Sequence, residues 1–169
     1  RCGSPWLEGV YDYPQIKPIV LASVATRRFD LWRYRELLPI GEETAVSIFD
    51  EGGSPLIKSK RFGRQLGLNH LYIKDERQTT TGSFKDRQAA VAVSAMRERG
   101  IKTCVMASAG NAAAAYSAYC AQAGIKLWVF VSSKVVPQKM QEVALYGAEV
   151  VKVSGTYDQT KVIAVDFAK

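Results

Sequence analysis

A regular alternation of helix-like and strand-like segments in the second half of this sequence constrains its fold more than any other feature. The expected helices end at Gly100, Gly124 and Gly147, which lie 24 and 23 residues apart, and an apolar strand-like run follows each glycine within two residues. Glycine favours the position after a helix because it adopts the left-handed backbone conformation without steric cost. Helices and strands that alternate with short connections build βαβ units. The sequence therefore predicts an α/β fold, a parallel sheet with flanking helices.

The second half divides into elements of ordinary length. We expect helices and strands in alternation, with helices over 83–99, 111–123, 137–146 and 157–168 and strands over 102–107, 126–131 and 148–153. The continuous apolar run at 127–131 is typical of a strand that is buried on both faces. Thr156 or Asp158 is the expected N-cap of the last helix.

The first half is less regular. Residues 1–18 contain several aromatic, glycine and proline residues and predict a short hairpin or an extended arm. Beyond them we expect short elements separated by loops, with helices over 29–38 and 58–66, extended segments over 55–57 and 71–74, and loops over 40–54 and 78–82. Glycines and polar residues mark both loops.

Composition narrows the class of protein. The 169 residues are 47% hydrophobic and 23% charged, which excludes a disordered or collagen-like chain and allows a buried core. No apolar run reaches the roughly 18 residues that cross a bilayer, so no membrane partner is expected. The three cysteines, Cys2, Cys104 and Cys120, cannot all pair within one chain. They predict free thiols in a reducing cytoplasm. Cys2 could belong to a Cys-x-x-Cys knuckle, but a closed zinc site cannot be assembled, so no metal is expected.

Charge and motif content exclude several functions. The formal net charge is +7, but the basic residues are dispersed, which disfavours nucleic acid and favours anionic metabolites as partners. The sequence has no Gly-x-Gly-x-x-Gly motif after a strand and no phosphate-binding Gly-Lys-Ser/Thr loop. The single histidine, His70, leaves little for a histidine-based triad or a metal site, and we expect it at the surface.

Lys85 is the first candidate for chemistry, in the segment Thr81-Gly82-Ser83-Phe84-Lys85-Asp86-Arg87. A lysine in the first turn of a helix meets the positive end of the helix dipole, which should lower the pKa of its ammonium. A lysine with a lowered pKa can act as an amine nucleophile and form a Schiff base. The alternative is a solvated lysine that pairs with Asp86 or Glu76.

The segment Ala107-Ser108-Ala109-Gly110-Asn111 is the second candidate, where a strand is expected to end and a helix to begin. Such a junction places backbone N–H groups at the C-terminal edge of a parallel sheet, where ligands of open α/β folds bind. The site suits a carboxylate or a phosphate, with Gly110 permitting close approach and Asn111 offering an amide. The alternative is a tight turn with Ser108 as the N-cap.

Together the two segments resemble the motifs of pyridoxal-phosphate enzymes of the tryptophan-synthase-β type, fold type II, and most closely those of threonine synthases. Residues 83–87 resemble the lysine motif of that family, and residues 108–111 resemble its Ser-x-Gly-Asn loop. The Asp86-Arg87 pair favours threonine synthase over threonine dehydratase. Supporting matches occur in the same order and spacing at 53–56, 73–76 and 146–151.

The resemblance implies pyridoxal 5′-phosphate as the cofactor and a role for each matching residue. Lys85 would be the internal aldimine lysine and later the proton shuttle, and Asn111 would hydrogen-bond to the 3′ oxygen of the cofactor. The substrate would be bound by Ser83, Ser108, Ala109 and Gly110, the last three receiving its carboxylate. The implied reaction converts O-phosphohomoserine to threonine by elimination of phosphate and addition of water. Two phosphorylated ligands would give the +7 charge a use.

The resemblance also implies a division of the chain. Residues 1–25 would form an N-terminal arm, 26–82 would contribute to a large domain, and 83–169 would form a small βα domain. Members of the family are about twice as long, and their C-terminal half supplies the loop for the cofactor phosphate. We therefore expect an N-terminal portion that by itself holds cofactor weakly and does not turn over, with the missing half or a second copy as its partner.

Departures from the family pattern leave alternatives open. Threonine synthases often carry threonine at the positions of Ala109 and Ala112, so two hydroxyl groups that could touch the substrate are absent. This affects the substrate assignment more than the cofactor assignment. The alternatives are a related lyase or β-replacing enzyme, such as cysteate synthase, diaminopropionate ammonia-lyase or serine/threonine dehydratase, and a truncated paralogue that acts as a binding or assembly module.

Overall fold

The structure, a computed structural model, describes residues 9–41 and 49–169. Its helices are α1 (Tyr13–Ser23), the 3-10 helix η1 (Leu31–Leu37), α2 (Lys60–Gln65), α3 (Lys85–Glu98), α4 (Asn111–Ala123), α5 (Pro137–Leu145) and α6 (Tyr157–Phe167). Its strands are β1 (Leu56–Lys58), β2 (Tyr72–Lys74), β3 (Thr103–Ala107), β4 (Lys126–Ser132) and β5 (Glu149–Val153).

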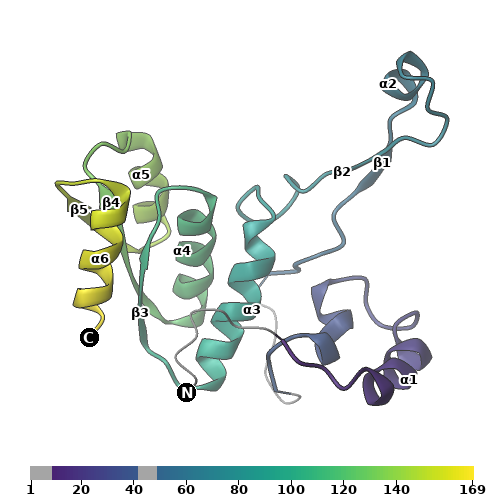
Figure 1. Ribbon diagram of the computed structural model, residues 1–169, viewed down its shortest axis with the longest axis horizontal. Coiled ribbons are helices and arrows are strands. Elements are labelled where there is room, and N and C mark those ends of the chain that lie inside the picture. The colour runs from purple at the N-terminus through teal and green to yellow at the C-terminus, as the bar shows by residue number, and fades with distance from the viewer. Residues whose placement is uncertain (1–8, 42–48) are drawn as a thin grey trace.

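A three-stranded parallel sheet organises the second half of the chain. Its strands lie in the order β3-β4-β5, with Thr103 paired to Lys126 and Trp128 paired to Glu149. Helices α4 and α5 cover one face of the sheet and α6 covers the other (Figure 1). The α/β prediction is therefore confirmed, and the predicted elements of this half begin and end within two residues of the observed ones.

The side chains of β4 alternate between two apolar cores. Leu127, Val129 and Val131 point to the face that α4 and α5 cover, whereas Phe130 packs with Val153 and Ala164 on the α6 face. Burial of each such side chain contributes about 1.5–3 kcal/mol to the free energy of folding. This two-sided burial explains why the strand is a continuous apolar run in the sequence.

The helix ends follow the expected chemistry. The residue after α4 is Gly124, with a left-handed φ of 65°, and its N–H bonds back to carbonyl groups of the last turn. Helix α6 begins with a capping box, in which the Thr156 side chain accepts from the Gln159 N–H and the Gln159 side chain accepts from the Thr156 N–H. Thr156, not Asp158, is therefore the N-cap.

A two-stranded hairpin projects from the rest of the molecule (Figure 1). Strands β1 and β2 are antiparallel, with Leu56 paired to Lys74, and α2 lies in the connection between them. All six strand residues are exposed, so neither face of this ribbon is covered in the described chain. Isolated two-stranded hairpins are only marginally stable in water.

The N-terminal prediction is wrong where the structure can test it. Residues 13–18 belong to helix α1, although a hairpin or an extended arm was expected. Asp12 caps this helix by accepting from the Gln15 N–H at 3.2 Å, and Pro14 in the first turn has a backbone angle that suits a helix start. Residues 1–8, including Cys2, lie outside the described residues.

Two further sequence expectations concern thiols and membranes. Cys104 and Cys120 are free thiols, as expected. Within residues 9–41 and 49–169, no helix is both long enough and apolar enough to cross a membrane.

Candidate active site

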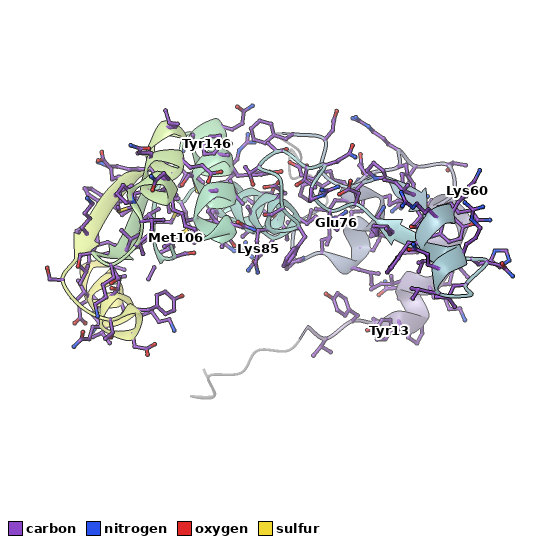
Figure 2. All side chains as sticks on the ribbon, turned by 90° about the horizontal axis from the view of Figure 1, so that it is seen from above. Tyr13, Lys60, Glu76, Lys85, Met106 and Tyr146 are labelled. Carbon is purple, nitrogen blue, oxygen red and sulfur yellow. The ribbon has the colours of Figure 1, made fainter. Side chains whose placement is uncertain are left out.

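Lys85 is the first residue of α3 and is half-buried. Its backbone N–H donates to Ser83 Oγ at 3.3 Å, and its Nζ atom lies 4.8 Å from the centre of the Phe84 ring. Seen from above, Lys85 lies between the sheet side of the molecule, marked by Met106 and Tyr146, and the hairpin side, marked by Glu76 and Lys60 (Figure 2).

The carboxylates beside Lys85 are bonded to other residues. Asp86 accepts hydrogen bonds from the backbone N–H and the hydroxyl of Thr81. Glu76 forms an ion pair with Arg87. Among the described residues the Lys85 amine therefore has no carboxylate partner, and the expected alternative of a pair with Asp86 or Glu76 does not occur.

A polar network fastens the base of the hairpin to the start of α3. Ser54 Oγ donates to Glu76 Oε1 at 2.6 Å, and Arg87 Nη2 donates to both Ser54 Oγ at 3.0 Å and Glu76 Oε1 at 3.1 Å. Lys74 Nζ donates to the Ser54 carbonyl oxygen. The family-like residues at 53–56 and 73–76 thus meet the lysine segment in space.

The second candidate segment connects β3 to α4. Gly110 is the N-cap residue in extended conformation, and no side chain caps the first turn of α4. Ser108 Oγ accepts from the Gly110 N–H at 3.4 Å, so Ser108 is not the N-cap that the alternative required. A Cβ atom built on Gly110 would meet nothing within 4 Å, so there is open space beside the loop. Asn111 is exposed at the helix start.

The two segments lie at the same end of the molecule. Helices α3 and α4 pack along each other, and both run antiparallel to β3, so their N-termini both lie at the C-terminal end of that strand (Figure 1). Two positive helix ends at one sheet edge favour an anionic ligand there. The arrangement offers a primary amine from Lys85 and an uncapped helix N-terminus beginning at Asn111.

Sequence comparison identifies the family of this fold. Residues 48–169 match the family described as "Pyridoxal-phosphate dependent enzyme". The chain belongs to this family. Lys85 and Asn111 both lie in the matched region, and the family depends on pyridoxal phosphate.

Curated relatives of this family member include threonine synthases. The chain is 37% identical over 171 residues to the threonine synthase of Methanocaldococcus jannaschii, covering 100% of this chain and 42% of that protein. It is 38% identical over 153 residues to the threonine synthase of Methanosarcina acetivorans, covering 90% of this chain and 37% of that protein. The chain therefore spans about two fifths of the length of these relatives.

Solved structures of other pyridoxal-phosphate enzymes share the fold. The processed form of threonine deaminase isoform 2 from Solanum lycopersicum superposes with a TM-score of 0.63 and 28% identity, over 68% of this chain and 34% of that one. A pyridoxal 5′-phosphate-dependent aspartate racemase superposes with a TM-score of 0.59 and 30% identity, over 68% and 36%. The chain therefore has the α/β architecture of fold type II enzymes.

The side chains present at the site fit this cofactor. A Schiff base to the cofactor aldehyde needs an amine that is not held in an ion pair, and Lys85 meets that condition among the described residues. The exposed amide of Asn111 can donate to the hydroxyl oxygen that is attached to the cofactor ring. The space beside Gly110 leaves room for a ligand. The donor set is thus suited to an aldehyde with an adjacent hydroxyl oxygen.

A buried polar cluster, which the sequence motifs do not predict, lies under the segment that precedes Lys85. A cavity of about 20 Å³, sufficient for one water molecule, is lined by residues that include Glu51, Thr80, Asp86 and Tyr119. Tyr119 is fully buried, and its burial raises the pKa of its hydroxyl. Asp86 could have been found from the sequence, because it is the one charged residue on the face of α3 that is buried.

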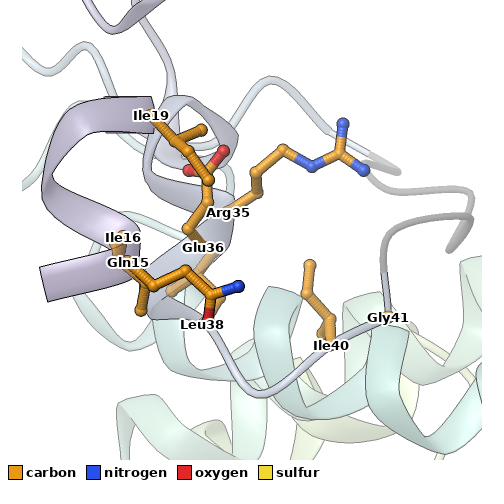
Figure 3. A pocket seen from close by; sticks show the side chains of 8 residues that line it. All are labelled: Gln15, Ile16, Ile19, Arg35, Glu36, Leu38, Ile40 and Gly41. Atoms are coloured by element: carbon orange, nitrogen blue, oxygen red, sulfur yellow. The ribbon is translucent and has the colours of Figure 1, made fainter. Parts of the chain in front are cut away.

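A separate pocket of about 300 Å³ lies between α1 and η1 (Figure 3). Ile16, Ile19 and Leu38 supply apolar walls, and Arg35 and Glu36 supply charged groups. None of the predicted site residues lines it, so it does not belong to the candidate active site.

Proposed function

We propose that the full-length protein converts O-phospho-L-homoserine to L-threonine and phosphate, as a pyridoxal-phosphate-dependent lyase of the cytoplasm. The observation that carries this proposal is the Lys85 amine, without a carboxylate partner in the described chain, at the same end of the packed helices α3 and α4 as the uncapped N-terminus of α4. The 37% identity to a threonine synthase across the whole chain supports this choice of reaction.

Each site residue has a defined task in this proposal. The bound cofactor supplies the electron sink that stabilises negative charge on the substrate carbon. Lys85 holds the cofactor through its Nζ atom and later moves protons at that same atom. Asn111 donates from its side-chain amide to the cofactor. The loop Ser108–Gly110, together with Ser83, binds the substrate and orients its carboxylate at the positive end of α4.

The remaining length of the protein is the proposed partner of this chain. We propose that residues 1–25 form an arm, that 26–82 contribute to a large domain, and that 83–169 form the small domain. The uncovered faces of the β1–β2 hairpin support this division, because such a ribbon needs further packing to be stable. A second copy of the chain is the other proposed partner, and the 169-residue chain alone should hold cofactor weakly.

The proposal is tested by the products of the full-length protein. We expect O-phosphohomoserine to yield phosphate and threonine in equal amounts, and the variant Lys85→Ala to yield neither. Lys102→Ala is the matched control, because Lys102 is exposed in the connection from the C-terminal end of α3 to β3 and should be dispensable. Absence of phosphate release from a protein that binds the cofactor would overturn the proposed reaction.

The second candidate is a related lyase that acts on another amino acid. Ala109 and Ala112 favour it, because they lack the hydroxyl groups that threonine synthases often carry at these positions. In this case the same protein would release ammonia and a 2-oxo acid from serine, threonine or diaminopropionate. The substitutions Ala109→Thr and Ala112→Thr would then be needed before phosphate release appears.

A further inference from the structure

Asp86 is a buried carboxylate that hydrogen-bonds back to Thr81 and thereby closes the loop of residues 81–86, which contains Lys85. Its side chain belongs to a residue that is 1% exposed, and its Oδ2 atom accepts from the Thr81 N–H at 2.7 Å. Its Oδ1 atom accepts from the Thr81 hydroxyl. Both carboxylate oxygens therefore accept hydrogen bonds from the same residue, Thr81, which lies five positions earlier in the chain.

The closed loop is further fixed from inside. Gly82 has a left-handed φ of 76°, which reverses the chain between Thr81 and Ser83. Ser83 is buried, its carbonyl oxygen accepts from Thr79 Oγ1 at 2.9 Å, and its hydroxyl accepts from the Lys85 N–H. These contacts fix the backbone of the loop where it enters α3. The hydrogen bonds between Asp86 and Thr81 hold the two ends of the loop together.

The geometry of α3 links the position of the Asp86 side chain to the direction in which the Lys85 side chain points. Consecutive residues of an α-helix point about 100° apart around the axis. Asp86 shares the buried face of α3 with Ala89, Ala90 and Val93. When Asp86 is held inward by Thr81, the rotation of the first turn is set and Lys85 is directed away from that core.

We propose that Asp86 is a positioning residue, which acts through Thr81 to fix the first turn of α3 and thereby the direction of the Lys85 amine. This inference rests on the proposed role of Lys85 as the cofactor-binding lysine. A carboxylate that only stabilised the helix N-terminus through the dipole would lower global stability when removed, without a selective effect on Lys85. The two roles therefore differ in a measurable way.

The test measures the reactivity of individual lysines in the full-length protein. Pyridoxal phosphate is added to the cofactor-free protein for a fixed time, the product is reduced with borohydride, and each lysine peptide is quantified by mass spectrometry. The variants are Asp86→Ala, Asp86→Asn and Thr81→Val. Thr156→Val is the matched control, because it removes a side-chain cap from α6 without touching α3. Melting temperature is recorded for every variant.

We expect Lys85 to be modified about tenfold more slowly in Asp86→Ala, as two hydrogen bonds to a buried charge are lost. The exposed lysines Lys102 and Lys126 should be modified at unchanged rates. Asp86→Asn, which keeps one acceptor oxygen, should recover part of the rate. Thr156→Val should lower the melting temperature and leave Lys85 unaffected.

Unchanged modification of Lys85 in the variants would overturn the positioning role, even if their melting temperatures fall. If Asp86→Ala fails to fold, Asp86→Asn and Thr81→Val carry the same prediction with a smaller expected loss. Failure of the proposed function gives a different result, because Lys85 would then not be modified in preference to other lysines in the unsubstituted protein.

Discussion

At the scale of single residues, the chemistry around Lys85 is set by how its charged neighbours are satisfied. Asp86 is bonded to Thr81 and Glu76 to Arg87, which leaves the amine without a carboxylate partner in the described chain. The sequence shows which residues are present in this segment, but it does not show which of them pair. Four cations and three carboxylates lie within 74–87, and only the fold selects among their combinations.

The ionisation of the Asp75 carboxyl group should make the stability of the folded protein depend on pH. The side chains of Arg77 and Gln78 donate to its carboxylate and hold its pKa well below the ordinary value of 3.8. A depressed pKa contributes stability that is present above about pH 4 and is lost as the pH falls below that value. We expect Asp75→Asn to be less stable than the unsubstituted protein at pH 7, and we expect this difference to be smaller at pH 3, where part of the contribution is lost. Urea unfolding at both pH values measures this difference, and an equal difference at both would contradict it.

The thiols of Cys104 and Cys120 should differ in their reactivity toward an alkylating reagent. Their sulfur atoms lie 3.7 Å apart, with Cys104 half-buried and Cys120 fully buried. Hydrogen bonding to Cys120 lowers the pKa of Cys104, whereas the same contact and burial raise that of Cys120. Because the thiolate is the reactive form, iodoacetamide should modify Cys104 first. Peptide mass spectrometry over a time course checks this, and earlier modification of Cys120 would refute it.

At the scale of elements, α4 is built for close packing. Ala113 and Ala115 are fully buried, with α3, β4 and α5 as neighbours of the helix. Ala115→Leu would overfill this space and should lower the free energy of unfolding by about 1–3 kcal/mol. Ala121→Leu is the matched control, because Ala121 is exposed on the same helix and should change stability little. Denaturant titration of both variants measures the contrast, and equal effects would contradict the packing argument.

The elements of the second half were predictable because their signals are local. Gly100, Gly124 and Gly147 end the helices, and the run at 127–131 fills both cores. Helix α1 was not predicted, because the aromatic, glycine and proline residues of 1–18 indicated a hairpin or an extended arm, although Asp12 caps the helix and Pro14 fits its first turn. The Asp86–Thr81 contact was missed because it depends on the rotation of α3 about its axis.

At the scale of the whole molecule, the hairpin predicts association. Leu56, Ile57, Tyr72 and Ile73 are each at least 45% exposed on a ribbon that projects into solvent (Figure 1). Exposed apolar surface of this kind marks an interaction site. We expect the 169-residue chain by itself to associate, with a solution mass above its 18.6 kDa. The double variant Ile57→Ser with Ile73→Ser should shift it toward that value. Sedimentation analysis decides, and a compact monomer of the unsubstituted chain would contradict the expectation.

The candidate site was predictable as two segments, and the structure adds their shared location. The sequence places Lys85 and Asn111 at expected helix starts, and the parallel topology brings both starts to one end of the molecule. The substrate could not be predicted in the same way, because Ala109 and Ala112 lack the hydroxyl groups that threonine synthases often carry at these positions.

The attachment site of the cofactor shows whether Lys85 is the cofactor-binding lysine. The full-length protein loaded with pyridoxal phosphate is reduced with borohydride and digested, and the lysine that carries the pyridoxyl group is located by mass spectrometry. We predict stoichiometric modification of Lys85, with the other eleven lysines of this chain largely unmodified. Modification of a different lysine, or of none, would contradict it.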